Sequence, residues 1–321
     1  MGRENEQPGS SALMDGPVLD GAWSVAGTAP WKDPPGTGGL AWPAGGAEAR
    51  RVTHVGPRRG WAALDLGELW AHRELLNFLV WRDVKVRYKQ TLLGAGWAVL
   101  QPLATMLVFT VFFGRLARMP SDGVPYPLFS FTSLLLWTYF AGAVTQASQS
   151  VVNNQATVSK IYFPRLLLPV SATLPGLLDL AIAFAMLPAM MLYFQRAPSW
   201  NLVWAPLFIL LAWSVALGTG SWLAAINVRF RDVRHVVPFL VQFWLFASPV
   251  VFAMSLVPAK WRALWALNPM VGVLEGFRWS VLGTGACPWP VLGIGQGVAA
   301  GLLISGLYFF RREERIFADV S

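Results

Sequence analysis

Six long stretches of apolar, uncharged residues constrain this chain more than any other feature of its sequence. They cover about residues 94–113, 127–147, 166–194, 202–226, 236–257 and 291–310. Each has about the 20 residues that an α-helix needs to cross the hydrocarbon core of a bilayer. Charged residues make up 13% of the chain, whereas a soluble domain has roughly 25%, so an ordinary soluble globule is excluded. The sequence predicts an all-α integral membrane protein with six transmembrane helices in residues 94–310.

The segments at the two ends of the chain differ from this region. Residues 1–60 contain 12 Gly and 7 Pro without apolar periodicity, which is typical of a flexible tail. Residues 61–93 have leucines three to four positions apart with charges between them, which predicts an amphipathic helix in the membrane interface. A surface helix of a soluble domain is the alternative, but the position directly before the first span favours the membrane. Residues 311–321 form a short C-terminal tail.

Two apolar regions depart from a simple straight span. The third stretch is long and contains Pro169, Pro175 and Pro188, so we expect it to tilt, to kink or to begin with an interfacial turn. Residues 258–290 are rich in apolar side chains, but charges such as Arg262 and Arg278 interrupt them. This pattern favours a pair of short re-entrant or interfacial helices over a seventh span.

The distribution of basic residues predicts the orientation of the chain. With both termini on one side, that side carries 19 of the 25 Lys and Arg residues, and the other side carries six. The positive-inside rule therefore places both termini in the cytoplasm. These basic residues flank apolar stretches and do not form the basic face of a folded domain, so we expect no binding of nucleic acid.

Motifs of the common catalytic sites are missing from the sequence. No Lys follows a Gly as in a phosphate-binding loop, and neither H-E-x-x-H nor G-x-S-x-G occurs. The single Cys287 excludes an intrachain disulfide and a zinc site built from cysteines. No pair of acidic residues suits a membrane glycosyltransferase. We therefore expect no enzymatic activity, and no metal or cofactor bound by this chain.

Asp179 is an acid near the middle of the third predicted span. An ionisable residue at the centre of a membrane helix costs about 2.5–3.5 kcal/mol on insertion scales and marks a functional hypothesis. Either it forms hydrogen bonds to a hydroxyl or basic group on a neighbouring helix, or it takes part directly in transport as an ion-coupled carrier. The structural role is favoured because no second ionisable group lies near a span centre.

Polar and aromatic residues share one face of the first and of the fifth predicted span. At about 100° per residue they form two stripes, made of Trp97, Gln101, Thr105 and Phe112, and of Phe239, Gln242, Phe243 and Phe246. Rings that stack on sugars, with amides between them, suit a passage for carbohydrate. The alternative is that the rings face lipid or pack between helices.

Two further segments are candidates for contacts with other helices or subunits. Gly293, Gly297 and Gly301 recur every four residues, which allows close approach of another helix, either in this chain or in a second copy. The cytoplasmic segment 149–165 is polar and then ends in Ile-Tyr-Phe-Pro-Arg. It is either an anchor at the lipid headgroups or a short coupling helix that sits on a cytoplasmic motor.

An ordered set of short motifs resembles the permease subunit of ABC-2 type polysaccharide exporters. The motifs are WRDVKVRYKQTLLGAG at 81–96, WAVLQP at 97–102, KIYFPR at 160–165, NVRFRD at 227–232, SPV at 248–250, NPM at 268–270 and ERIFAD at 314–319. Each motif is weak alone, but their order and the predicted topology agree over about residues 64–321. The N-terminal 60 residues have no counterpart in this pattern.

The resemblance implies a homodimer of six-span permeases, joined to two copies of a separate ATPase subunit that binds ATP and Mg²⁺. It implies that the first and fifth spans of both copies line a channel for a lipid-linked polysaccharide, most often O-antigen, in the bacterial inner membrane. It also implies that residues 258–284 form short helices near the periplasmic exit. Contacts with the ATPase would come from Trp81, Arg82, Asp83, Arg87 and Tyr88, and from Asn153, Asn154, Lys160, Tyr162, Phe163 and Arg165.

The cargo stays open at this stage. Teichoic acid, capsule polysaccharide, or a small lipid or drug are alternatives for a permease of this kind. An ion-coupled carrier built around Asp179 is a further alternative, and it predicts transport that is independent of ATP.

Overall fold

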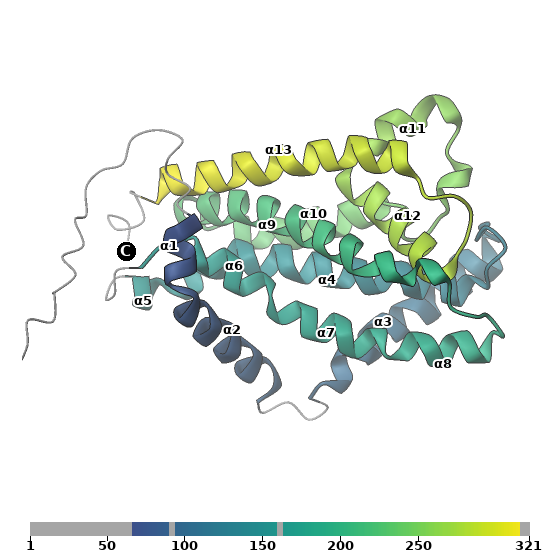
Figure 1. Cartoon of the computed structure of the whole chain (residues 1–321), viewed down its shortest axis with the longest axis horizontal. Coiled ribbons are helices and arrows are strands. Elements are labelled where there is room, and N and C mark those ends of the chain that lie inside the picture. Colours follow the sequence, from purple (N-terminus) through teal and green to yellow (C-terminus); the bar gives the residue numbers. More distant parts are fainter. Residues whose placement is uncertain (1–65, 90–93, 159–162, 315–321) are drawn as a thin grey trace, which may run out of the picture. The chain divides into compact units, whose positions relative to one another are not determined.

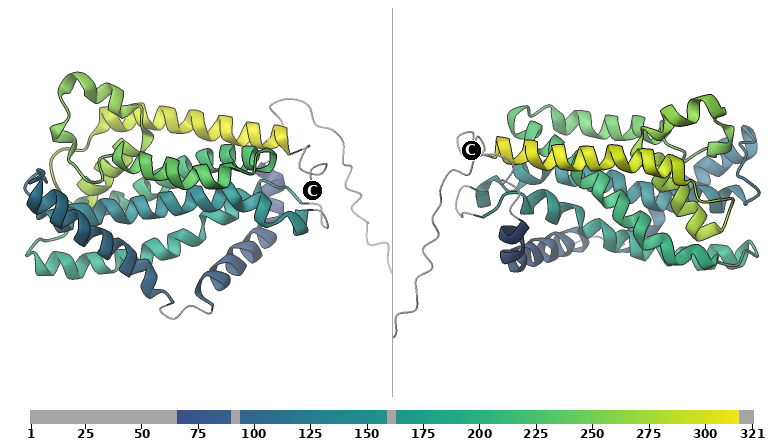
Figure 2. Two further views of the ribbon diagram at one scale, coloured as in Figure 1. Left: turned by 180° about the vertical axis from the view of Figure 1, so that it is seen from behind. Right: turned by 45° about the horizontal axis from the view of Figure 1, so that its top comes forward.

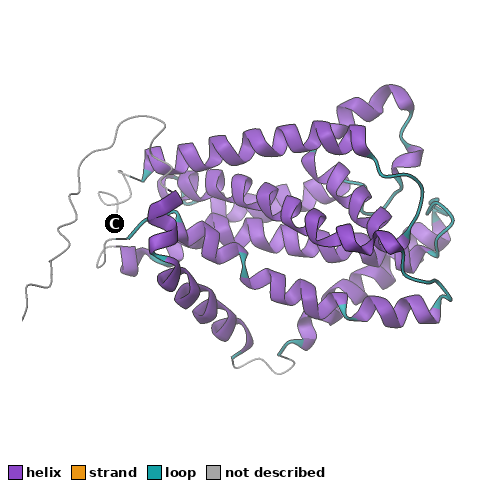
Figure 3. Ribbon diagram, viewed as in Figure 1, coloured by secondary structure: helices purple, strands orange, loops and turns teal. Residues whose placement is uncertain are grey.

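A computed structural model describes residues 66–89, 94–158 and 163–314 of the chain. The chain divides into two units, residues 1–56 and 57–321, and every described residue lies in the second. All regular structure in the described residues is helical, without a strand (Figure 3). The prediction of an all-α protein is confirmed for these residues, and the predicted tail at 1–60 lies outside them.

Five segments are long and apolar enough to cross a membrane. They are Gly96–Leu116, Tyr126–Asn153, Leu167–Tyr193, Trp200–Arg229 and Trp289–Glu313. The first segment consists of α3 (Gly96–Phe109) and a π-helical turn (Thr110–Leu116). The second is α4 (Tyr126–Asn153), and the fifth is α13 (Trp289–Glu313). The fourth is a 3₁₀ turn (Trp200–Trp204) followed by α9 (Ala205–Arg229). These segments coincide with five of the six predicted spans.

The third span is divided into three helices, as its prolines predicted. They are α6 (Leu167–Thr173), α7 (Pro175–Phe184) and α8 (Met186–Tyr193). Pro175 is the first residue of α7, and Pro188 lies in the first turn of α8. Proline has no N–H to donate and its ring clashes with the carbonyl four residues before it, so the helix breaks just before each of these positions.

The fifth predicted span differs from the expectation of one long helix over 236–257. The helix α10 (Val233–Phe246) has 14 residues and is shorter than the five segments above. Turns follow as far as the 3₁₀ turn Met254–Leu256. The break falls at Ala247 and Ser248, directly before Pro249, which cannot donate to the helical ladder.

Side chains from two other helices bond the backbone where α10 ends. Asn268 donates to the carbonyl of Ala247 at 3.1 Å, and Tyr126 donates to the carbonyl of Val251 at 2.7 Å. Arg278 donates to the carbonyl of Pro249 at 2.7 Å. Because unpaired carbonyls are costly inside a membrane protein, non-helical backbone persists there only when other groups bond it. The side chains of Asn268, Tyr126 and Arg278 therefore stabilise the break after α10.

Two short helices, α11 (Ala259–Ala266) and α12 (Pro269–Leu282), occupy the region between α10 and α13. Nearly every residue of α12 is buried against α4, α9 and α13. A Cβ at Gly272 would come within 2.7 Å of the backbone of Leu292, so α12 and α13 touch closely. The α12 helix ends at Gly283, whose positive φ of 68° suits a helix C-terminus.

The α9 helix packs against both α4 and α13, and Figures 1 and 2 show α13 running along α9. A Cβ at Gly306 would lie 2.3 Å from the carbonyl oxygen of Gly218, so these two glycines allow the helices to cross in contact. By contrast, Gly293, Gly297 and Gly301 have no described atom near their Cβ positions. The prediction that this stripe packs against another helix of the same chain is therefore wrong for the described residues.

The predicted interfacial segment contains α1 (Leu66–Ala71) and α2 (Arg73–Tyr88). The α2 helix packs against α6 and α7, and Leu79 is buried among Val158, Phe163 and Phe310. Figure 1 shows the end of α2 and the start of α3 on the same side of the bundle, next to α7.

Candidate functional site

A cavity of about 600 Å³ lies between α2, α3, α4, α7 and α10. This volume is within the range of small-molecule sites, roughly 300–1,000 Å³. Its walls combine apolar residues with amide, hydroxyl and charged side chains. Helices far apart in the sequence therefore contribute to one site.

Half of the residues predicted to line a channel meet at this cavity. Trp97, Gln101 and Thr105 line it from successive turns of α3, and Gln242 lines it from α10. The α3 residues are four positions apart, which places them on one helix face. The two amides and the indole ring suit a ligand that has both hydroxyl groups and C–H faces.

The other four predicted channel residues do not line the cavity. Phe112 on the π-helical turn is 56% exposed, and Phe239, Phe243 and Phe246 on α10 are 71%, 67% and 53% exposed. These rings therefore lie largely on the surface of the described residues, away from the cavity.

The end of α2 is tied to the third span by a charged contact. Arg87 donates from Nη1 to Oδ2 of Asp179, and the hydroxyl of Tyr88 donates to Oδ1 of the same carboxylate. All three residues line the cavity. Burial, and then the hydrogen bond to Asp179, raise the pKa of Tyr88 to about 12, so its phenol stays protonated as a donor at neutral pH.

Tyr139 on α4 adds an unusual group to the same cavity. The residue is 4% exposed, and among the described residues its hydroxyl has no hydrogen-bond partner. Its ring packs against α7, where a Cβ at Gly176 would lie 3.2 Å from the ring carbon Cδ2. A buried polar atom without a partner is rare and calls for a specific explanation.

The residues predicted to contact an ATPase fall into three groups. Trp81 is 63% exposed and Asn153 is exposed, so both are accessible in the described chain. Arg82 and Asp83 form an ion pair with each other at 2.8 Å. Arg87 and Tyr88 instead face the bundle, at Asp179.

The second predicted contact segment is held to the rest of the chain at Phe163 and Arg165. The side chain of Asn154 donates to the carbonyl of Ser150 at 2.8 Å, and Phe163 is 4% exposed. Arg165 donates from its backbone N–H and its guanidinium to Glu314 at the end of α13. The short helix α5 (Gln155–Val158) lies between these residues. Lys160 and Tyr162 lie outside the described residues.

Sequence reasoning missed the contribution of α4 to the cavity. Thr138, Tyr139, Gly142, Thr145 and Gln146 all line it. Their spacing of three to four residues is the signal that could have found them, because it places polar and small residues on one helix face. The pairing of Arg87 with Asp179 had no such local signal, since the two are 92 positions apart.

A second cavity of about 650 Å³ lies beside α11 and α12. Its charged residues are Asp122, Arg262, Glu275 and Arg278, and each has a hydrogen-bond partner within the chain. The first cavity is the stronger candidate because four of the predicted channel residues and the Arg87–Asp179 pair line it.

The five long apolar helices define a multi-pass α-helical membrane protein. The chain belongs to the ABC-2 type transporter family, whose model matches residues 74–282, more than half of the chain. Its relatives include the O-antigen export system permease protein RfbA of Myxococcus xanthus, 31% identical over 214 residues, which are 66% of this chain and 81% of that protein. The corresponding protein of Klebsiella pneumoniae is 24% identical over 248 residues, covering 77% of this chain and 95% of that protein.

The polysialic acid transport protein KpsM of Escherichia coli is 23% identical over 206 residues, which are 63% of this chain and 78% of that protein. The matched family and these relatives confirm the resemblance that the sequence motifs indicated.

Proposed function

We propose that this chain is the permease subunit of an ABC transporter that exports a cell-surface polysaccharide, with O-antigen as the cargo that is best supported. The observation that carries the proposal is the family match over residues 74–282, together with relatives named for export of O-antigen and transport of polysialic acid. The cavity between α3 and α10 supports it, because these helices supply an indole ring and amides suited to sugars. In this proposal the glycan is linked to a lipid.

The proposed location is the bacterial inner membrane, with both termini in the cytoplasm. The 19 Lys and Arg residues on the terminal side, against six on the other, support this orientation. The proposal counts six crossings, with α10 and the turns after it as the fifth. In it α1 and α2 lie at the cytoplasmic interface, and α11 and α12 form the re-entrant pair on the periplasmic side.

A separate ATPase subunit supplies the work in this proposal and holds ATP and Mg²⁺. Two permeases and two ATPases make the complete transporter. The exposed Trp81 on α2 and the exposed Asn153 at the end of α4 support contacts with the ATPase on this side. The anchoring of Arg165 on Glu314 supports transmission of movement from this segment to α13.

The experiment is reconstitution of the permease with its partner ATPase, with export of lipid-linked glycan and assembly of the complex as readouts. Replacing Trp97 by Ala should reduce export about tenfold, the effect of losing about 1.4 kcal/mol of aromatic contact, while assembly survives. The matched control is Trp200→Ala, because Trp200 is 98% exposed and lies outside the cavity. If the permease never binds an ATPase, or if export is independent of ATP, the proposal is wrong.

A further inference from the structure

Glu314 at the end of α13 joins two parts of the chain that are distant in sequence. Its Oε1 accepts from the backbone N–H of Arg165 at 3.1 Å, and the guanidinium of Arg165 donates to the carbonyl of Glu314 at 2.5 Å. Its Oε2 pairs with Nη1 of Arg311, three residues earlier on α13, at 3.2 Å. Glu314 is also the first residue of the ERIFAD motif, whose other residues lie outside the described part of the chain.

The bonds of Glu314 lie in a mostly buried place. The side chain of Glu314 is 18% exposed, and that of Arg311 is 13% exposed. Charge-assisted hydrogen bonds are stronger than neutral ones, and a low local dielectric strengthens them further, whereas an ion pair in solvent contributes little. The contact between Glu314 and Arg165 therefore resists separation more than an exposed ion pair would.

Apolar side chains reinforce the same contact. Phe163 is 4% exposed and Phe310 of α13 is 0% exposed, and both belong to one buried cluster with Leu79 of α2 and Val158 of α5. The cluster brings the end of α13 together with both parts of the chain that the sequence predicted to contact an ATPase. Moving segment 163–165 away from α13 would expose this apolar surface to water, which costs free energy.

The α13 helix is held closely to α9 as well. Trp222 of α9 stacks on Phe309, with ring centroids 4.1 Å apart and an interplanar angle of 15°, and its indole donates to Oγ of Ser305 at 3.0 Å. A Cβ at Gly306 would lie 2.3 Å from the carbonyl oxygen of Gly218. Because close packing leaves little room for one helix to slide along the other, we expect α9 and α13 to move together.

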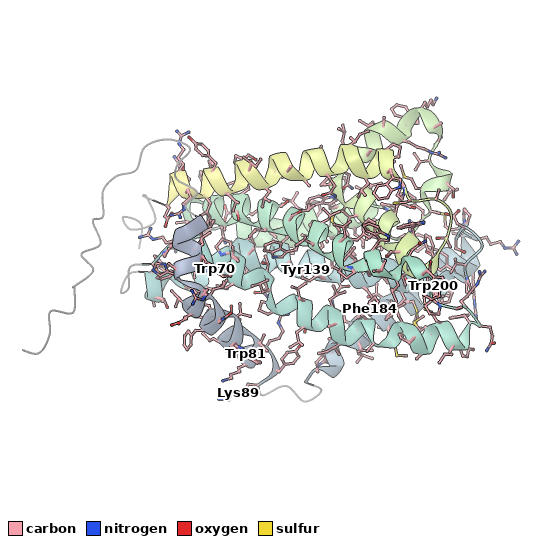
Figure 4. The ribbon with its side chains drawn as sticks, in the orientation of Figure 1. Trp70, Trp81, Lys89, Tyr139, Phe184 and Trp200 are labelled. Atoms are coloured by element: carbon pink, nitrogen blue, oxygen red, sulfur yellow. The ribbon has the colours of Figure 1, made fainter. Side chains whose placement is uncertain are left out.

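The other end of α13 contacts the two short helices. A Cβ at Gly272 of α12 would lie 2.7 Å from Cα of Leu292, and α11 also packs against α13. Figure 1 shows α13 extending from the end of the bundle at α1 and α5 to the end at α11 and α12, and Figure 4 shows Trp70 at the first end and Trp200 at the second. One helix therefore contacts segment 163–165 and the α11–α12 pair with its opposite ends.

We propose that Glu314 is a positioning residue for export: it fixes segment 163–165 on α13, so that a displacement of this segment by the ATPase moves α13, and α12 with it. Movement of α12 reaches the turns after α10, because Arg278 of α12 donates to the carbonyl of Pro249 there. Glu314 acts through Arg165 and not on the cargo. This inference rests on the proposed function, which supplies the ATPase.

The test measures the glycan exported per ATP hydrolysed by the complex in lipid vesicles, with lipid-linked glycan purified from the native cells as cargo. Glu314→Ala removes both acceptor oxygens, and this ratio should fall about 2- to 30-fold. Glu313→Ala is the matched control, because it removes the neighbouring carboxylate of α13 and leaves the bonds of Glu314 in place. The control should keep the wild-type ratio, and an unchanged ratio in Glu314→Ala would overturn the proposal.

Glu314→Gln separates the bond to Arg165 from the charge of Glu314. The amide oxygen of Gln can still accept from the N–H of Arg165, whereas the ion pair with Arg311 is lost. The ratio should therefore stay above half of the wild-type value. A fall as large as that in Glu314→Ala would assign the effect to the ion pair and overturn the positioning of Arg165.

Gly272→Ala tests the other end of α13. The added Cβ would lie 2.7 Å from Cα of Leu292, so α12 and α13 must separate, and the ratio should fall at least about twofold. Gly297→Ala is the control, since it adds the same methyl group to α13 where the described chain leaves open space. An unchanged ratio in Gly272→Ala would show that movement does not pass from α13 to α12, and would overturn that step.

The ratio also separates coupling from a purely structural role. Loss of stability alone lowers the melting temperature and the amount of assembled complex, whereas each assembled complex keeps its ratio. A lower melting temperature with the wild-type ratio would therefore overturn the inference. Absence of ATP-dependent export by the wild-type complex would instead overturn the proposed function, whereas wild-type export with unchanged ratios in the variants removes only this inference.

Discussion

The guanidinium of Arg278 lies over the ring of Phe129, 4.2 Å from the ring centroid, and joins α12 to α4. Arg278 is 3% exposed, and it also donates to the carbonyl of Pro249 and pairs with Glu275. A buried charge is tolerated only when it is paired and hydrogen-bonded. Arg278 meets this condition with groups from three separate segments, so it holds α4, α12 and the turns after α10 together.

Replacing Arg278 by Met should therefore destabilise the protein strongly. The change leaves Glu275 without its cation and the carbonyl of Pro249 without its donor, and breaking a buried pair costs roughly 3–5 kcal/mol. A large fall of the melting temperature in detergent is expected. Arg262→Met is the control, because Arg262 is exposed and has one bond to a backbone carbonyl. Equal melting temperatures for the two variants would contradict the role given to Arg278.

The two sets of glycines on α13 should respond differently to an added methyl group. Gly306→Ala places a Cβ 2.3 Å from the carbonyl oxygen of Gly218, so α9 and α13 must separate, at a cost of about 1–3 kcal/mol. Gly297→Ala adds the same methyl group where the described chain leaves open space. The melting temperature should fall for Gly306→Ala and stay or rise for Gly297→Ala. A fall in both variants would show that the stripe at 293–301 is also packed.

The exposed rings of α10 lead to a prediction about the proposed second copy. The test is the variant Phe243→Cys in a Cys287→Ala background. If the α10 rings face the second copy, a short bis-maleimide should cross-link two copies of this variant through residue 243. The control is Trp200→Cys in the same background. Trp200 is also exposed, but it lies before α9 and not on α10. Cross-linking is read as a dimer band on a denaturing gel. Lack of the band at 243, with labelling of the cysteine confirmed, would place these rings against lipid.

The apolar stretches predicted the helices well because length and hydropathy act locally. The breaks of the third span followed from Pro175 and Pro188, since proline acts on its own helix whatever surrounds it. The shortening of α10 was not predicted. It depends on Asn268 and Arg278, which lie 20 or more residues further along the chain and bond the backbone at the break.

In the candidate site too, local sequence predicted some features, whereas others depend on residues that are distant in the chain. Trp97, Gln101 and Thr105 were found because they share a face of one helix, and that face lines the cavity. The α10 stripe was only partly informative, since Gln242 faces the cavity while the rings beside it face outward. Helical periodicity gives the members of a face but not what the face contacts. The contact between Arg87 and Asp179 depends on how α2 packs on α7, which no local pattern records.

Asn268 should control the end of α10. Its side chain accepts from the indole of Trp244 at 2.9 Å and donates to the carbonyl of Ala247 and the hydroxyl of Ser248. Asn268→Ala leaves these groups without that partner, at a cost of about 1–3 kcal/mol. Since local opening governs exchange, amide hydrogens in the last turn of α10 should exchange about 5- to 150-fold faster by mass spectrometry.

The matched control for this change is Asn201→Ala, because Asn201 lies in the 3₁₀ turn before α9, away from the end of α10. Exchange in α10 should be unchanged in that variant. Export should also fall in Asn268→Ala if α10 must hold Gln242 at the cavity, because loosening its last turn shifts that amide. Unchanged exchange at residues 243–248 in Asn268→Ala would show that the turns after α10 are held without this side chain, and would leave Arg278 and Tyr126 as the groups that fix the break.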